Sequence, residues 1–183
     1  QINYGGHITF IRCRSDRFGM DYYGDGSSID GNHGFYLDGL GIVVDDCSVG
    51  ESIPGTGGMG CKIRGGNPKI INCDFRSATV KKYDLVESQD IQLEHVLRDP
   101  DFNRSEVAGC VFRVDTEAVY RLARSGSDDY APWKRKGYDY IHDNTYVFYN
   151  DVSSESAIRL LRTDDNNGAS NTRNAKVVFW GNV

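Results

Sequence analysis

The stretch Ile42–Val49, IVVDDCSV, is matched by Pro68–Phe75, PKIINCDF, further along the chain. Both segments alternate apolar residues with others and then place a polar residue directly before a cysteine. Alternation with a period of two is typical of a strand that buries one face. A frame that returns at a similar interval predicts stacked repeats, because neighbouring repeats bury together the apolar residues that one repeat cannot bury alone.

The same frame fits five further segments, which start at Ile8, Ile91, Glu117, Tyr146 and Val177. Its polar corner residue then falls at Arg12, Asp46, Asn72, His95, Arg121, Asn150 and Gly181. We therefore expect an all-β solenoid of about seven coils with loop insertions, forming one domain over residues 1–183. A β-sandwich is the alternative, because it also has many short strands, but it does not explain the recurring frame. The start without methionine indicates a processed protein or a piece of a longer chain.

The five cysteines are predicted to be reduced packing residues. Their number is odd and no CxxC pair occurs, which argues against a zinc site. Their spacing is compatible with disulfides but does not require them. Free cysteine behaves as a small apolar residue, which suits a buried column of stacked repeats. We expect Cys13, Cys47 and Cys73 in one inward column that Val96 and Leu122 continue, and Cys61 and Cys110 in another.

The charge balance excludes some classes of function. With 26 acidic against 21 basic residues, the net charge is −5, whereas nucleic-acid binding needs a basic footprint. No apolar run approaches the roughly 18 residues that span a membrane. We therefore expect neither nucleic acid nor membrane as a partner.

The frame of alternating apolar residues, Asn, Cys and a further apolar residue resembles the coil repeat of the pectate-lyase-like superfamily. The resemblance covers residues Ile8 to Val183. In coils of such lyases an asparagine adjoins an apolar strand, and His142–Tyr146 and Phe179–Asn182 look like these coils. It implies a right-handed parallel β-helix with a long carbohydrate lying along one sheet. The superfamily includes polysaccharide lyases, glycoside hydrolases and phage tailspikes, so fold alone does not assign function.

A second, weaker series places candidate site residues on one outer face. In Gly34–Gly39, Gly60–Gly65, Gly109–Val114 and Ala157–Arg162, alternate residues point outward. The outward residues are Tyr36, Asp38, Lys62, Arg64, Arg113 and Arg159. A cationic strip suits an anionic sugar chain, because arginine forks onto carboxylates. We expect Lys62, Arg64 and Arg113 to be catalytic and Tyr36, Asp38 and Arg159 to bind substrate; a merely solvated sheet face is the alternative.

Two loop groups complete the candidates. The segment 128–136 combines aromatic and cationic residues, and we expect Tyr130, Trp133 and Lys134 to bind substrate, unless Trp133 only anchors the loop. Calcium, which related lyases use, would need oxygen ligands such as those of Asp21, Asp25 and Asp30 or of residues 164–167. Turn formation by Asp and Asn is the simpler explanation of these residues, so the metal ligands stay open.

The resemblance and the strip together predict an extracellular, secreted polysaccharide-degrading enzyme. We expect first a lyase acting on an acidic, uronate-containing polysaccharide. One alternative is a non-catalytic glycan- or receptor-binding β-helix of a tailspike or adhesin, on a virion surface and as a homotrimer. The other is a glycoside hydrolase, although Asp45-Asp46 lacks the residues that accompany a catalytic aspartate pair in that family.

Overall fold

The computed structural model describes most of the strand-forming segments of the chain. The described residues are 2–16, 34–50, 59–76, 81–82, 85–86, 89–95, 104–114, 118–123, 137–148, 159–163 and 175–183. Within these ranges the chain forms strands and short turns and no helix. The segment 116–124, which has the best helical pattern of the sequence, contains strand β15 (Ala118–Ala123).

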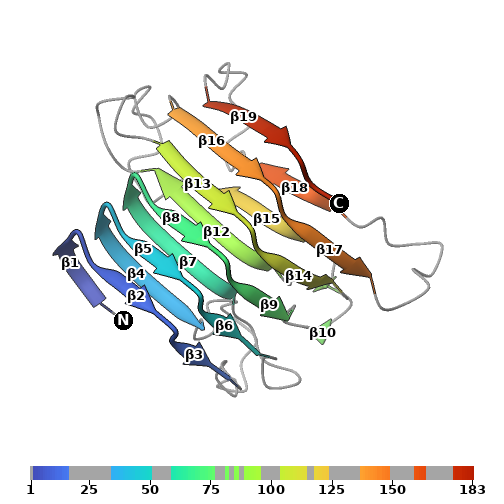
Figure 1. Ribbon diagram of the computed structural model, residues 1–183, viewed down its shortest axis with the longest axis horizontal. Coiled ribbons are helices and arrows are strands. Elements are labelled where there is room, and N and C mark those ends of the chain that lie inside the picture. Colours follow the sequence, from blue (N-terminus) through green and yellow to red (C-terminus); the bar gives the residue numbers. More distant parts are fainter. Residues whose placement is uncertain are drawn as a thin grey trace.

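Three parallel sheets make up the structure (Figure 1). Sheet A contains β1 (Ile2–Gly6), β4 (Phe35–Leu40), β7 (Met59–Gly66), β12 (Gln89–His95), β15 and β18 (Arg159–Thr163). Sheet B contains β2 (Thr9–Ile11), β5 (Val43–Asp45), β8 (Lys69–Ile71), β13 (Arg104–Ala108), β16 (Gly137–His142) and β19 (Ala175–Trp180). Sheet C contains β3 (Arg14–Ser15), β6 (Ser48–Val49), β9 (Asp74–Arg76), β14 (Val111–Val114) and β17 (Thr145–Phe148). A separate antiparallel pair joins β10 (Lys81–Lys82) to β11 (Leu85–Val86).

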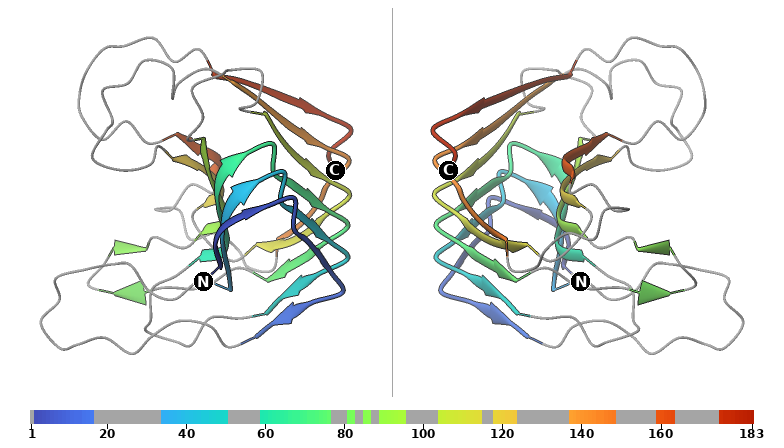
Figure 2. Two further views of the ribbon diagram at one scale, coloured as in Figure 1. Left: turned by 90° about the vertical axis from the view of Figure 1, so that its left-hand side faces the viewer. Right: turned by 90° about the vertical axis from the view of Figure 1, so that its right-hand side faces the viewer.

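The chain visits sheets A, B and C in rotation, and each visit adds a strand beside the previous one. Sheets B and C meet at one corner and sheet A lies across from it (Figure 2). We call one passage through the three sheets a repeat. The prediction of an all-β protein with parallel strands is confirmed, and the arrangement is consistent with a β-solenoid.

The corner between sheets B and C is made by one residue with a left-handed backbone. These residues are Arg12, Asp46, Asn72, Gly109, Asp143 and Gly181, with φ between 50° and 63°. Asn and Asp tolerate this region better than most residues, and Gly does so without strain. The corner prediction is confirmed at the first three positions and at Gly181.

The prediction is wrong at His95 and Arg121, which lie within strands β12 and β15 of sheet A. Asn150 lies outside the described residues. Gly109 and Asp143 take the fourth and fifth corners instead, so the described strands form six repeats in sheets A and B rather than seven. The reason is physical: period-two alternation is the same in every sheet, so it does not tell which sheet a strand joins.

The residue that directly follows each corner belongs to one ladder of stacked side chains. Its members are Cys13, Cys47, Cys73, Cys110, Asn144 and Asn182. Cys110 therefore belongs with the first three cysteines and not with Cys61, which lies in sheet A. Leu122 is not part of this ladder, because it pairs with Leu93 in sheet A, and Val96 lies outside the described residues.

The ladder residues hold the backbone of neighbouring repeats. The amide of Cys13 donates to Sγ of Cys47 at 3.3 Å, and the amide of Cys110 donates to Oδ1 of Asn144 at 2.9 Å. The amide of Asn144 in turn donates to Oδ1 of Asn182 at 3.1 Å. The prediction of free cysteines is confirmed, and burial raises the pKa of the Cys47 thiol to about 11. A protonated, buried thiol is a packing residue and not a nucleophile.

Aliphatic and aromatic side chains fill the space between the sheets. Val44 and Ile70 of sheet B and Ile63 of sheet A are almost fully buried. On sheet C, the rings of Phe75 and Phe112 stack with centroids 5.2 Å apart, and Tyr146 of the next repeat extends the stack. Burying such side chains stabilises the fold by about 1.5–3 kcal/mol each.

The ladder gives a first prediction, which concerns Asn144. Replacing Asn144 by alanine leaves the Cys110 amide and the Val107 carbonyl without their side-chain partner. Each buried polar group left unpaired costs about 1–3 kcal/mol, so we expect the free energy of unfolding in urea to fall by several kcal/mol. Asn144→Cys should lose less, because cysteine occupies this ladder position in the repeats before it.

Arg12→Asn is the matched control, because Arg12 is an exposed corner residue and asparagine adopts the left-handed backbone readily. This variant should keep the stability of the parent. An Asn144→Ala protein as stable as the parent would contradict the role given to the ladder.

Candidate functional site

The outer face of sheet A brings four of the predicted site residues together. Tyr36 on β4 pairs in register with Lys62 on β7, and Asp38 pairs with Arg64. Cys61 and Ile63 are buried on the inner face, so Lys62 and Arg64 point the other way. Nζ of Lys62 lies 5.3 Å from the centroid of the Tyr36 ring, and Cζ of Arg64 lies 5.9 Å from it. We call Tyr36, Asp38, Lys62 and Arg64 the sheet A cluster.

The sheet A cluster holds its cations in fixed places. Lys62 is only 8% exposed although it lies on the outer face. A desolvated ammonium over an aromatic ring is stabilised by the ring quadrupole, by about 2 kcal/mol in favourable cases. Among the described residues, the sheet A cluster combines two cations, one phenol ring and one carboxylate. Such a site can bind an anionic group or stabilise negative charge that develops during a reaction.

Further basic residues share the register position of Lys62 in later repeats of sheet A. The backbone pairing places Gln92, Arg121 and Arg162 in the same row as Tyr36 and Lys62. Sequence reasoning did not select Arg121 or Arg162. Arg121 was missed because the prediction made it a corner residue, whereas it lies within β15. Arg162 was missed because the prediction placed Leu160 inward, whereas Leu161 aligns with Tyr120.

Arg159 does not share this row. Its register partner is Ala118, and Ala118 aligns with Gln89 and, one strand further, with Met59. Met59 lies two residues before the buried Cys61, whereas Lys62 lies one residue after it. The prediction paired Ile158 with Leu160 as the inward residues, and a shift of one residue exchanges the two faces of a strand. Arg159 therefore does not extend the strip that the sequence predicted.

Arg113 lies on sheet C, away from the sheet A cluster. The prediction aligned Gly109 with Gly34 and Gly60, but Gly109 is a corner residue, so the strand after it joins sheet C. There Arg113 forks onto Asp74, with Nε–Oδ1 at 2.9 Å and Nη2–Oδ2 at 3.1 Å. The pair lines a groove of about 430 Å³ that also includes Arg14 and Arg76.

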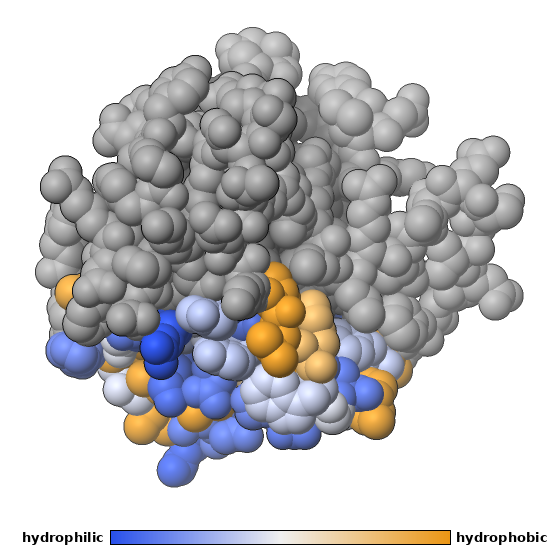
Figure 3. All heavy atoms as spheres, turned by 90° about the horizontal axis from the view of Figure 1, so that it is seen from above, coloured by the Kyte–Doolittle hydropathy of each residue, from blue (hydrophilic) through white to orange (hydrophobic). Residues whose placement is uncertain are grey.

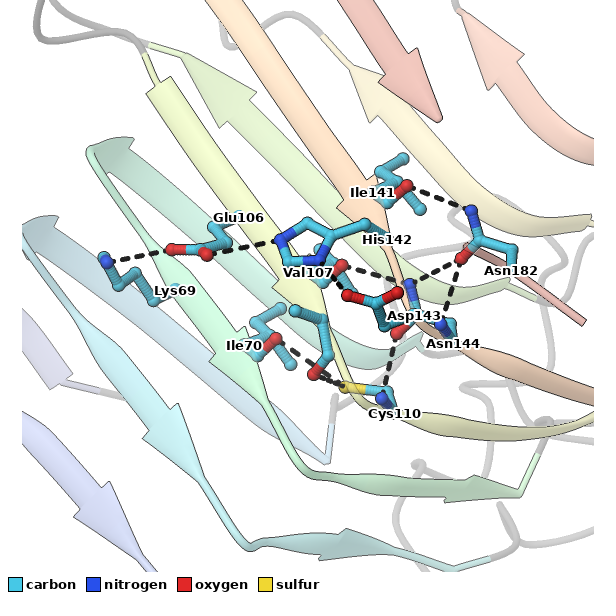
Figure 4. A network of polar contacts seen from close by, with 11 residues as sticks. Lys69, Ile70, Glu106, Val107, Cys110, Ile141, His142, Asp143, Asn144 and Asn182 are labelled. Atoms are coloured by element: carbon cyan, nitrogen blue, oxygen red, sulfur yellow. Dashed lines mark hydrogen bonds and ion pairs between the residues drawn. The ribbon is translucent and has the colours of Figure 1, made fainter. Parts of the chain in front are cut away.

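A second polar cluster, which sequence reasoning missed, lies on the outer face of sheet B. Nζ of Lys69 contacts Oε2 of Glu106 at 2.8 Å, and Oε1 of Glu106 lies 3.3 Å from Nε2 of His142 (Figure 4). Nδ1 of His142 lies 2.8 Å from Oδ2 of Asp143. The His142 ring stacks on Trp180, with centroids 4.1 Å apart. The signal in the sequence was the alternation of Tyr138, Tyr140 and His142, three ring-bearing residues on one face of a strand.

The Glu106 carboxylate is kept ionised by its neighbours. The hydrogen bond from Lys69 is the largest cause that lowers the pKa of Glu106, and His142 adds to it, while partial burial opposes the change. Both nitrogens of His142 face carboxylate oxygens, one of Glu106 and one of Asp143. Polar contacts thus link Lys69, Glu106, His142 and Asp143 across neighbouring strands.

Several predicted residues fall outside the described part of the chain. These are Tyr130, Trp133 and Lys134, and the oxygen ligands considered for calcium at Asp21, Asp25, Asp30 and residues 164–167. Among the described residues, no group of three or more His, Cys, Asp or Glu could hold a metal ion. The same part of the chain has no helix long and apolar enough to cross a membrane.

The lowered pKa of Glu106 predicts a pH-dependent contribution to stability. The ion pair with Lys69 stabilises the fold at pH values above 4.5, the ordinary pKa of the carboxyl group, and this contribution is lost as the pH falls through the lowered value. Because Lys69 is half exposed, screening keeps the contribution below about 1 kcal/mol.

The measurement is a double-mutant cycle of Glu106→Gln and Lys69→Met, by urea unfolding at neutral pH and well below pH 4.5. The coupling energy should be present at neutral pH and vanish in acid. Equal coupling at both pH values would contradict the assignment.

Comparisons of this chain with protein-family models, with curated proteins and with solved structures found no match in any of the three. The family resemblance of the coil frame therefore stays an expectation. What the protein does must be inferred from the chemistry of its own described residues.

Proposed function

We propose that the protein is a right-handed parallel β-helix that binds an acidic polysaccharide along the outer face of sheet A. The observation that carries the proposal is the sheet A cluster, in which Lys62 and Arg64 both lie over the Tyr36 ring. Aromatic rings pack against the apolar faces of sugars, and fixed cations pair with carboxylates. One site that offers both suits a uronate-containing chain.

The arrangement of the sheet supports a long ligand rather than a single sugar. Parallel strands lie about 4.8 Å apart, so the row from Tyr36 and Lys62 through Arg121 to Arg162 runs along the stacking direction. The backbone register places basic residues at several steps of this row, as a polymer with repeated negative charges requires. A linear polyanion also gains from the focused field of such a row.

The lengths of the connections point to the same sheet. The chain passes from sheet B to sheet C through two residues in every described repeat, such as Asp46-Cys47. The long connections all adjoin sheet A, among them residues 16–34 before β4 and 124–136 after β15. Functional residues concentrate in loops that a rigid scaffold carries. The predicted substrate-binding residues Tyr130, Trp133 and Lys134 belong to one of these connections.

The test of binding uses affinity electrophoresis in gels that contain polygalacturonate, alginate, hyaluronan or a neutral glucan. We expect retardation by at least one acidic polymer and none by the neutral one. Lys62→Met and Arg64→Gln should each weaken binding by about tenfold, since each removes roughly 1.4 kcal/mol of charge-assisted contact.

Thr9→Ala, on the outer face of sheet B, is the control and should bind as the parent does. Retardation that is absent with every acidic polymer, or unchanged in both sheet A variants, would refute the proposed site.

A second candidate function is β-elimination at the same cluster, which makes the protein a polysaccharide lyase. The approach of two cations to the Tyr36 ring favours it. Arg64 and Lys62 would neutralise the uronate carboxylate. Tyr36, as the phenolate after loss of its own proton to solvent, would take the proton from the adjacent ring carbon. The electron pair released forms a carbon–carbon double bond as the glycosidic C–O bond breaks, and the departing oxygen is protonated by solvent.

The lyase candidate predicts unsaturated uronate ends, which absorb in the ultraviolet. Tyr36→Phe should abolish their formation while binding in the gel remains, because the ring stays and only the hydroxyl is removed. New reducing ends without ultraviolet absorbance would indicate a glycoside hydrolase instead. Binding without either product would leave a non-catalytic glycan-binding protein.

A further inference from the structure

The outer face of sheet B contains a hollow of about 360 Å³ between β8, β13 and β16. Lys69, Arg104, Glu106 and Tyr140 line it and carry its chemistry. The hollow belongs to a different sheet from the sheet A cluster, so a ligand there does not compete for the residues of the proposed polysaccharide site. Its volume is within the range of small-molecule pockets and is large enough for a sugar unit.

One aromatic residue, Tyr140, lines the hollow, and further rings on the same face lie next to Tyr140. Tyr138 and Tyr140 lie two residues apart on β16, with ring planes 8° apart, and the guanidinium of Arg104 lies 5.9 Å from the Tyr138 ring. Trp180 meets Tyr140 edge to face and is 45% exposed. From above, hydrophobic and hydrophilic residues lie side by side on the described part of the surface (Figure 3). Amphipathic surfaces of this kind match ligands that have an apolar face and a polar rim.

The polar residues of the hollow offer donors and acceptors in fixed positions. Lys69 and Glu106 hold each other at 2.8 Å, and His142 fixes the second oxygen of the carboxylate. An ammonium has three donors and a carboxylate has about four acceptor positions, so both can also engage ligand hydroxyls. Beneath them, Ser105 donates a hydrogen bond to the buried Asp139, which fixes the strand pair that carries the site.

We propose that this hollow is a second carbohydrate site that binds one pyranose unit. The sugar ring packs on Tyr140, two neighbouring hydroxyls bridge Lys69 and Glu106, and Arg104 contacts a further hydroxyl or a carboxylate. An ordered ammonium–carboxylate pair offers donors on one side and acceptors on the other. Adjacent sugar hydroxyls fit it, because each hydroxyl can both donate and accept a hydrogen bond. This site is independent of the sheet A cluster and of any cleavage there.

The experiment is saturation-transfer NMR with glucose, galactose, N-acetylglucosamine, glucuronate and galacturonate as probes. We expect transfer to at least one sugar and a change in the fluorescence of Trp180 during titration, because its ring edge lies against Tyr140. Tyr140→Ala and Arg104→Gln should each weaken that affinity by about tenfold. The acidic and neutral probes then distinguish a carboxylate contact of Arg104 from a hydroxyl contact.

Two controls separate this proposal from the one for sheet A. Thr9 lies in the same register row as Tyr140, but four strands away from it and two strands away from Lys69. Thr9→Ala should therefore bind the sugar normally. Arg64→Gln should also bind the sugar normally, while its affinity for the polymer falls by about tenfold. No transfer to any of the five sugars, or transfer unchanged in both Tyr140→Ala and Arg104→Gln, would overturn the proposal.

Discussion

Each repeat of this chain turns from sheet B into sheet C at a single residue with a left-handed backbone, and the rest of the structure depends on this turn. The turn allows the next residue to point inward, where Cys or Asn stacks on its equivalents. Side chains of one repeat thereby hold amides of the repeat before it. Because the turn is two residues long wherever it is described, sheets B and C keep the same register through all the repeats that contain both.

The same constraint explains how far the sequence alone could predict the fold. The frame at Ile42–Val49 and Pro68–Phe75 contains both the corner and the ladder cysteine, so it predicted stacked parallel strands and the first three corners correctly. It failed at His95, where the same alternation occurs in a strand of sheet A. Gly109 could not be told from the glycines that open sheet A strands, because glycine adopts left-handed and extended backbones alike.

Errors in register had direct consequences for the candidate site. Tyr36, Asp38, Lys62 and Arg64 were predicted correctly as neighbours because their two strands share the same alternation and pair in register. Arg113 moved to another sheet once Gly109 became a corner. The cluster around Glu106 and His142 was invisible for a different reason: its members come from three repeats, and their contacts follow from pairing that no local pattern contains.

The three outer faces now have different chemistry on one scaffold. Sheet A carries cations over a tyrosine, sheet B carries linked polar residues beside aromatic rings, and sheet C carries arginines paired with aspartates. The connection between sheets B and C is two residues long in every described repeat, whereas the segments next to sheet A differ widely in length. One residue added at a corner would turn every later outward side chain of that repeat toward the interior. The scaffold can therefore acquire new chemistry by lengthening loops beside sheet A, but it can grow along its axis only by whole repeats.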